Sequence, residues 1–197
     1  MNDVISDIKK ETIPSINPAT GGTIGYTELN TIEELKDAVK KGKEVQPLWA
    51  EKSFHDRAEH IFKIRNFIVD NADEIAQVIS NDSGKTLIDA LSTEVVSSVM
   101  ASNYYAKNTK KFLKRKHLKA GNILLINKRS YIDRVPFGVV GIISPWNYPF
   151  AIPFHEVIMA LIAGNAVILK VATQTLEVGK MIKRVIDAGD LPKHLFT

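Results

Sequence analysis

The sequence has no cysteine, so none of its 197 residues can form a disulfide. It also has little excess of either charge, because 26 Lys and Arg residues stand against 22 Asp and Glu residues and leave a net charge of +4. A pI of about 9.1 is compatible with nucleic-acid binding, but an excess this small does not require it. We therefore predict a protein without disulfides and without a nucleic-acid partner.

Long hydrophobic runs are also missing. The most apolar stretch, residues 138–159, is interrupted by polar residues and prolines well before the roughly 18 residues that a membrane span needs. Residues 1–11 alternate acidic and basic side chains and lack the apolar centre of a secretory signal. Together with the missing cysteine, these features predict a cytoplasmic protein that does not enter a membrane. Its 45% of hydrophobic residues can nevertheless form a sizeable core.

The chain is expected to open with a hairpin. Residues 17–22, Asn-Pro-Ala-Thr-Gly-Gly, have turn chemistry and separate two β-leaning stretches, residues 12–16 and 23–29. Thr31 and Glu34 then have the spacing of a capping box, which predicts the start of a helix.

Three helices are expected in the first part of the chain. The apolar stripe of the first runs as far as Pro47. Ser53 predicts the start of a second helix, which should break near Asn71. A third is expected after Asp89 and runs out in the basic stretch 107–119.

After residue 121 the pattern changes to the alternation that is typical of strands. Residues 123–126 and 131–135 are predicted to pair around a polar turn at residues 127–129. This pairing would form a hairpin or a long arm.

A strand–helix–strand–helix order follows. Residues 139–143 and 166–170 are apolar throughout, and a helical stretch follows each of them. Strands of this kind, joined by helical crossovers, indicate a parallel sheet that is covered on both faces. Residues 196–197 would begin a third strand. Because two strands do not make a finished sheet, we expect the chain to be the front part of a longer domain.

The predicted fold class is therefore α/β. It combines an N-terminal helical region, a β-hairpin arm and the start of a doubly wound, Rossmann-like parallel sheet. The three expected parts are residues 1–120 as the helical region, residues 121–135 as the arm and residues 136–197 as the first βαβα of the sheet domain.

Several apparent motifs fail on their spacing. Residues 82–86 end like a phosphate-binding P-loop, but the glycine required earlier is Ile79. His155 and Glu156 resemble the start of a zinc-protease helix, yet no second histidine follows, so no metal site is predicted. No G-x-G-x-x-G turn follows the first parallel strand, so a dinucleotide would have to be held differently. The basic stretch 107–119 could meet phosphates, but a solvated helix end explains it better.

The most informative segment is residues 144–149, Ser-Pro-Trp-Asn-Tyr-Pro, which follows the first parallel strand. Ligands of open parallel sheets bind at this end of the strands. The two prolines hold Trp146 and Asn147 on a stiff, non-helical bridge, so that Asn147 can present its amide to a substrate oxygen. The alternative is that Asn147 bonds loop backbone and Trp146 fills the core. The flanking prolines favour the substrate interpretation.

Two stretches resemble, in order and spacing, the signature of the aldehyde dehydrogenase superfamily. They are residues 136–149, PFGVVGIISPWNYP, and residues 160–170, ALIAGNAVILK. Weaker similarities extend the resemblance over nearly the whole chain; they lie at residues 17–20, at the helix end around Trp49, at residues 83–85 and at residues 188–189. The resemblance implies the NAD(P)-dependent oxidation of an aldehyde to a carboxylic acid.

The resemblance also implies roles for individual residues. Lys170 would hydrogen-bond the adenosine ribose, although snorkelling to water would be the preferred explanation without the loop. Asn147 would donate to the oxyanion, where loss of such a donor costs roughly 3 to 4 kcal/mol. Thr173 stands where many members have a glutamate that would repel a 2′-phosphate, so the cofactor can be NADP or NAD. The nicotinamide and ribose side of the cofactor would be lined by Ile143, Ser144, Pro145 and Trp146.

The family's nucleophile is a cysteine thiolate, which this sequence lacks. The resemblance places the nucleophile, the glutamate base and the turn that contacts the diphosphate beyond Thr197. We therefore expect these 197 residues alone not to oxidise an aldehyde. The full-length protein would do so as a homo-oligomer, with residues 150–159 forming part of the substrate funnel.

Two functions of other classes stay open. The chain could be a non-catalytic binding or interaction module that pairs with a partner through residues 123–135. It could also bind nucleic acid through residues 107–119, which salt-dependent binding to duplex DNA would reveal.

Overall fold

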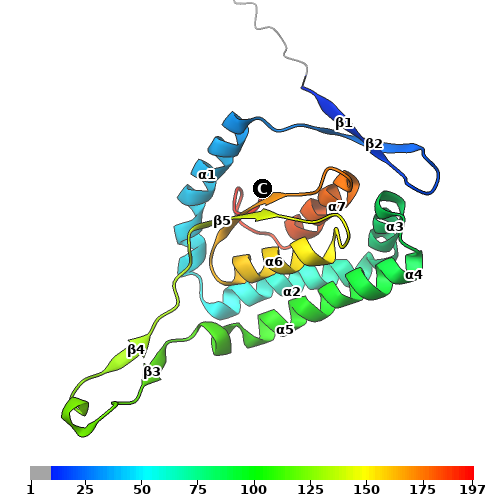
Figure 1. The fold of residues 1–197 in the computed structure, drawn as a ribbon. Coiled ribbons are helices and arrows are strands. Elements are labelled where there is room, and N and C mark those ends of the chain that lie inside the picture. Colours follow the sequence, from blue (N-terminus) through cyan, green and yellow to red (C-terminus); the bar gives the residue numbers. More distant parts are fainter. Residues whose placement is uncertain (1–9) are drawn as a thin grey trace, which may run out of the picture.

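The structure is a computed structural model that describes residues 10–197 and is drawn as a ribbon in Figure 1. Residues 1–9, which hold most of the segment used to argue against a secretory signal, lie outside the described part. Within residues 10–197, no helix is both long and apolar enough to cross a membrane. The elements in chain order are β1 (Thr12–Ile16), β2 (Thr23–Glu28), α1 (Ile32–Glu51), α2 (Phe54–Asp70), α3 (Ala72–Ser83), α4 (Leu87–Asp89), the π-helical η1 (Ala90–Val95), α5 (Val96–Leu113), β3 (Lys116–Leu118), the 3-10 helix η2 (Ile123–Leu125), β4 (Ser130–Ile132), β5 (Val139–Ile143), α6 (Ala151–Ile162), β6 (Ala166–Lys170) and α7 (Leu176–Asp187).

The first hairpin and the first helix start are confirmed. β1 and β2 pair antiparallel, and α1 begins at the predicted capping box. The Thr31 hydroxyl accepts a hydrogen bond from the backbone N–H of Glu34 at 3.1 Å, while the Glu34 carboxylate accepts from the backbone N–H of Thr31 at 2.9 Å. Lys10 pairs with the same carboxylate, so the hairpin is also tied to α1 by an ion pair.

α1 runs past Pro47, the end of the predicted apolar stripe. The helix continues to Glu51, and in this last turn Trp49 is fully buried. The indole N–H of Trp49 donates to the Leu161 carbonyl at 2.7 Å. Burial of this large side chain offsets the hydrogen bond that a proline inside a helix cannot donate.

The predicted break between the next two helices is confirmed, since α2 ends at Asp70 and α3 begins at Ala72. The third helical segment starts at Leu87, slightly before the predicted Asp89. Thr86 caps it, since its hydroxyl accepts from the backbone N–H of Asp89 at 3.2 Å. It then passes through a π-helical turn, η1, before it continues as α5.

The buried face of α5 carries small polar side chains. Met100 and Tyr104 are 66% and 54% exposed, whereas Ser98, Ser102 and Thr109 are buried. α5 packs against both α2 and α6. Small side chains on the buried face allow close packing of the helices.

The arm is a hairpin, but only its second strand overlaps the predicted one. β3 and β4 pair antiparallel, with Lys116 opposite Ile132, and residues 123–126 are not a strand. They form the tip, which projects away from the rest of the molecule in Figure 1. Asn122 explains the difference, because its side chain accepts from the backbone N–H of Leu124 at 3.0 Å and closes a tight turn there.

The predicted parallel strands are confirmed. β5 and β6 pair in parallel, with Val139 opposite Ala166 and Ile143 opposite Lys170. Residues 195–197 add a short parallel segment on the far side of β6, where the backbone N–H of Thr197 donates to the Val167 carbonyl at 3.0 Å. α6 and α7 follow the two strands as expected, so the α/β fold class is confirmed.

A single hydrophobic core joins the helical region to the sheet region. It includes Trp49 and Ile61 from the first part of the chain and Phe154, Val167 and Ile182 from the last part. The sheet helices therefore cannot reach this packing without α1 and α2. The division at residues 120 and 135 stays a prediction.

Candidate functional site

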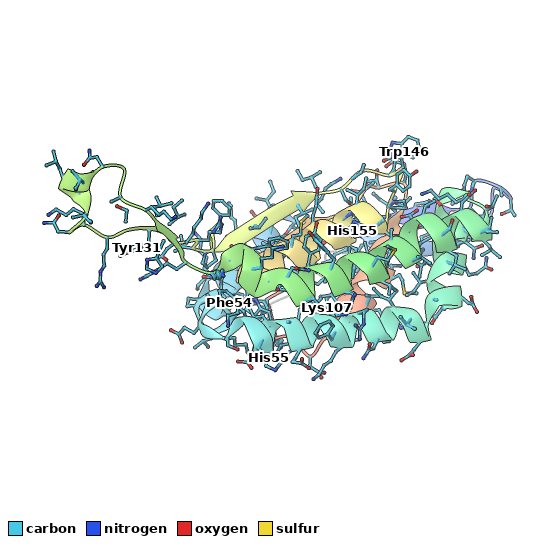
Figure 2. The ribbon with its side chains drawn as sticks, turned by 90° about the horizontal axis from the view of Figure 1, so that it is seen from below. Phe54, His55, Lys107, Tyr131, Trp146 and His155 are labelled. Carbon is cyan, nitrogen blue, oxygen red and sulfur yellow. The ribbon has the colours of Figure 1, made fainter. Side chains whose placement is uncertain are left out.

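The loop from Ser144 to Pro149 lies at the carboxyl end of β5, directly before α6. Ser144 is buried, and its backbone N–H donates to the Lys170 carbonyl at 3.0 Å, so the loop starts from within the sheet. Trp146 is 62% exposed, and Figure 2 shows it projecting from the edge of the molecule. The alternative that Trp146 fills the core is therefore wrong.

Asn147 is exposed in the middle of this loop. Within residues 10–197, its side-chain amide makes no hydrogen bond to the loop backbone or to another side chain. The amide is therefore available to an outside acceptor, which is what a donor to a substrate oxygen requires.

The end of the loop is anchored by Glu94, a residue that the sequence analysis missed. The Glu94 side chain is completely buried, and its Oε2 accepts from the backbone N–H groups of Phe150 at 2.8 Å and Ala151 at 3.1 Å. Its Oε1 accepts from the Lys85 ammonium at 2.5 Å. The Lys85 ammonium also lies 3.8 Å from the centre of the Tyr148 ring, within the loop. The only sequence signal was the weak similarity at residues 83–85.

The opposite end of α6 is held by donors from α1 and α2. Arg57 is buried, and its Nε donates to the Ile162 carbonyl at 3.0 Å. Gln46 donates to the Gly164 carbonyl at 2.8 Å, in addition to the Trp49 bond to α6. A carboxylate at the first turn and a guanidinium at the last turn both interact favourably with the helix dipole. α6 is thus fixed at both ends and presents the loop from a rigid support.

α7 is capped in the same way by Asp82. This side chain is buried, and its Oδ2 accepts from the backbone N–H of Val178 at 2.9 Å. Burial raises the pKa of the Asp82 carboxyl above its ordinary value.

Both helices that follow a parallel strand therefore carry a buried carboxylate at the N-terminus. In ordinary dinucleotide-binding folds, the N-terminus of the first such helix receives the cofactor's diphosphate. Here Glu94 already uses the first N–H groups of α6. This helix N-terminus is therefore not free to receive a diphosphate in the ordinary way, in agreement with the missing glycine-rich turn.

Lys170 and Thr173 line one cleft of about 540 Å³ beside β6. Its other walls come from β6 itself, α1 and the segment before α1, and its apolar lining includes Leu35, Ala38 and Ile168. Both volume and lining are those of a small-molecule site. The cleft also contains carboxylates from Glu28, Glu34 and Asp37.

These carboxylates are paired with lysines. Lys10 lies 3.6 Å from Glu28 and 2.5 Å from Glu34, and Lys41 lies 2.5 Å from Asp37. Lys10 is the main reason why the pKa of the Glu34 carboxyl falls to about 2. These carboxylates are ionised, but lysines offset their charge, so the apolar walls and the Lys170 ammonium could accommodate the adenosine end of a dinucleotide.

The other predicted site residues do not line this cleft. Ile143 lies opposite Lys170 in the sheet and is 80% exposed, so it connects the cleft to the loop across the strand ends. Ser144, Pro145 and Trp146 follow it on the loop, and Asn147 lies beyond them. The structure therefore places Lys170 and Thr173 together and the loop residues on the neighbouring strand end.

His155, in the second turn of α6, lies among the residues expected to form the substrate funnel. Burial lowers the pKa of its imidazole, and a hydrogen bond to the backbone of Ser97 in α5, which raises this pKa, offsets only part of the effect. Its Nε2 atom is buried without a hydrogen-bond partner among residues 10–197. Figure 2 shows the ring close to the interface between the two helices.

Comparison with known proteins agrees with this arrangement. The profile of the aldehyde dehydrogenase family matches residues 5–197. The 4,4'-diapolycopene aldehyde oxidase of Methylomonas sp is 30% identical over 93% of this chain and 35% of its own length. The alpha-ketoglutaric semialdehyde dehydrogenase of Bacillus subtilis (strain 168) is 31% identical over 89% of this chain and 35% of its own length. The chain thus spans about a third of the length of these relatives.

A solved structure also shares the fold. The crystal structure of an aldehyde dehydrogenase from Brucella melitensis biovar abortus 2308 matches with a TM-score of 0.87 and 27% identity. The match covers 94% of this chain and 38% of that one.

Proposed function

The chain belongs to the aldehyde dehydrogenase family, and we propose that it contributes the cofactor seat and the oxyanion donor for the NAD(P)-dependent oxidation of an aldehyde to a carboxylic acid. One observation carries this proposal. The loop from Ser144 to Pro149 and the cleft at Lys170 lie at the carboxyl ends of two adjacent parallel strands, where open sheets of this type bind ligands. The nicotinamide, when bound, accepts hydride from the aldehyde carbon.

Asn147 is the proposed oxyanion donor. The side chain is exposed and has its donors free, while the loop around it is stiffened by two prolines and anchored at both ends. A donor that is already oriented stabilises negative charge as it develops on the substrate oxygen, without a cost of reorganisation. Next to it, Ile143, Ser144, Pro145 and Trp146 would line the nicotinamide and ribose side.

Lys170 and Thr173 are the proposed adenosine-ribose contacts. Lys170 supplies an ammonium at the exposed end of β6, and Thr173 supplies a hydroxyl in the same cleft. Neither side chain repels a 2′-phosphate, and an ammonium attracts one. The proposed cofactor is therefore NADP or NAD.

The aldehyde-oxidising reaction itself is not proposed for these 197 residues alone. The family's thiolate nucleophile cannot come from a chain without cysteine. Homo-oligomerisation through the arm is also part of the proposal, because its tip exposes Ile123, Leu124 and Ile126. The cytoplasmic location stays a prediction.

The proposal is tested by titrating the purified chain with NADP⁺ and NAD⁺ in a calorimeter. Lys170→Met should weaken binding of NADP⁺ by about tenfold, because one charge-assisted contact is lost. Lys107→Met is the matched control, since Lys107 is an exposed lysine on α5, which contributes no residue to the lining of the cleft. Lys107 is labelled in Figure 2. Equal affinity of the two variants, or no binding by the unmodified chain, would contradict the proposal. Turnover of an aldehyde by this chain would contradict its expected inactivity.

A further inference from the structure

Glu94 is a buried charge that the proposed reaction does not use directly. Its side chain is completely inaccessible to solvent, and it comes from the π-helical turn η1. Ala90, Glu94 and Val95 are all buried, since the wider π-helical turn brings positions four and five residues apart closer to one face. A buried carboxylate is costly unless it is paired and fully hydrogen-bonded. The hydrogen-bond partners of the Glu94 side chain, Lys85, Phe150 and Ala151, all belong to, or touch, the end of the loop that carries Asn147.

These partners form a connected clamp. Glu94 holds the backbone N–H groups of Phe150 and Ala151, directly after the loop. Lys85 binds Glu94 and lies against the face of the Tyr148 ring, the residue next to Asn147. Since the Lys85 side chain is only 20% exposed, its ammonium is partly removed from competing water.

The other end of the loop is attached to the sheet through Ser144, whose N–H bonds to Lys170. Asn147 therefore lies between one anchor in the sheet and a second anchor made by Lys85 and Glu94. We propose that Lys85 and Glu94 are positioning residues, which fix the loop from Ser144 to Pro149 and thereby the direction of the Asn147 amide. This inference rests on the proposed function of Asn147 as oxyanion donor.

Trp146 reports on this loop without any cofactor. The chain has two tryptophans, of which Trp49 is fully buried and Trp146 is exposed on the loop. Incorporation of 5-fluorotryptophan gives two ¹⁹F resonances, and Trp146→Phe assigns them. Glu94→Ala should shift the Trp146 resonance toward that of the free amino acid and raise acrylamide quenching of its fluorescence. The Trp49 resonance should stay in place.

The matched control is Asp82→Ala. It removes a buried carboxylate that caps α7 in the way that Glu94 caps α6. If the role of Glu94 is local to the loop, Asp82→Ala lowers the melting temperature but leaves the Trp146 resonance unchanged. Glu94→Gln keeps an acceptor for the backbone N–H groups of Phe150 and Ala151. Its Trp146 resonance should therefore lie between those of the unmodified chain and of Glu94→Ala.

Lys85→Met provides a second variant in case Glu94→Ala does not fold. It keeps the aliphatic stem but removes the ammonium from both Tyr148 and Glu94, and it should also shift the Trp146 resonance. An unchanged Trp146 resonance in a folded Glu94→Ala or Lys85→Met chain would overturn the inference. An equal shift in Asp82→Ala would overturn it as well, because general loosening would then explain the effect.

A separate measurement distinguishes this inference from the proposed function. Failure of the unmodified chain to bind NADP⁺ would refute the cofactor seat. The Trp146 measurements contain no cofactor, so they decide the positioning of the loop independently of that result.

Discussion

Thr173→Glu should change the cofactor preference of the chain. Thr173 lies in the same cleft as Lys170, on the exposed segment after β6. A glutamate at this position would add a negative charge beside the site proposed for the adenosine ribose. We expect weaker binding of NADP⁺ and unchanged or tighter binding of NAD⁺.

The magnitude follows from the charge and from the exposure of the site. Two unit charges about 4 Å apart repel by about 4 kcal/mol at an effective dielectric constant near 20. Thr173 is exposed, so solvent and salt screen most of this energy and leave about 1 to 1.5 kcal/mol. The affinity for NADP⁺ should therefore fall by about tenfold. For NAD⁺ the new carboxylate can accept a ribose hydroxyl, which contributes about 0.5 to 1.5 kcal/mol.

The assay is calorimetric titration with the pair 2′,5′-ADP and AMP, which differ by the 2′-phosphate alone. Thr173→Gln is the control, because it has a similar size without the charge. At about 1 M salt the Debye length is about 3 Å, so the difference between the Glu and Gln variants should shrink strongly.

Three results would refute the reasoning. Thr173→Gln could weaken the binding of 2′,5′-ADP as much as Thr173→Glu does, which would indicate a steric effect. The Glu variant could bind both nucleotides as the unmodified chain does, in which case Thr173 does not face the ribose. An effect that is independent of salt would show that repulsion between the two charges is not its cause.

Further predictions concern the stability of the elements that support the site. Gly179→Ala should lower the free energy of unfolding by about 1 kcal/mol, because its Cβ would lie 2.8 Å from Val171 Cγ2 and this overpacking exceeds the gain in helix propensity. In chemical denaturation of a Val171→Ala background, the same change should instead be stabilising. Arg57→Met should cost about 2 to 4 kcal/mol in the same assay, since the carbonyl of Ile162 and two others lose their donor; a loss below about 0.5 kcal/mol would contradict this. Burial lowers the pKa of His155, so the folded state favours the neutral imidazole. Its contribution to the free energy of unfolding is therefore fully present above the ordinary pKa of 6.5, and it is lost as the pH falls below that value. Relative to His155→Gln, the unmodified chain should therefore lose stability on acidification from pH about 7.5 to about 5, and parallel stability curves would disprove this.

The sequence alone determined the elements whose causes are local. The capping box at Thr31 and Glu34 and the turn at residues 17–22 were identified from neighbouring residues, and the structure confirms them. The strands at residues 139–143 and 166–170 were also identified, from their continuous apolar pattern. The expected covering of both faces is incomplete at β5, where only Ile142 is buried and Ile143 is 80% exposed. The loop at residues 144–149 could be singled out because its two prolines act on the residues next to them.

Only the tertiary structure decided the features that depend on distant partners. α1 continues past Pro47 because Trp49 is buried against α6, and Glu94 is important because it meets backbone N–H groups 56 and 57 residues away. No local pattern indicates such partners, since the burial of a polar side chain is set by whatever folds over it. The same reason applies to Lys170 and Thr173. Their spacing was visible in the sequence, but α1 and β2 were needed to make a cleft around them.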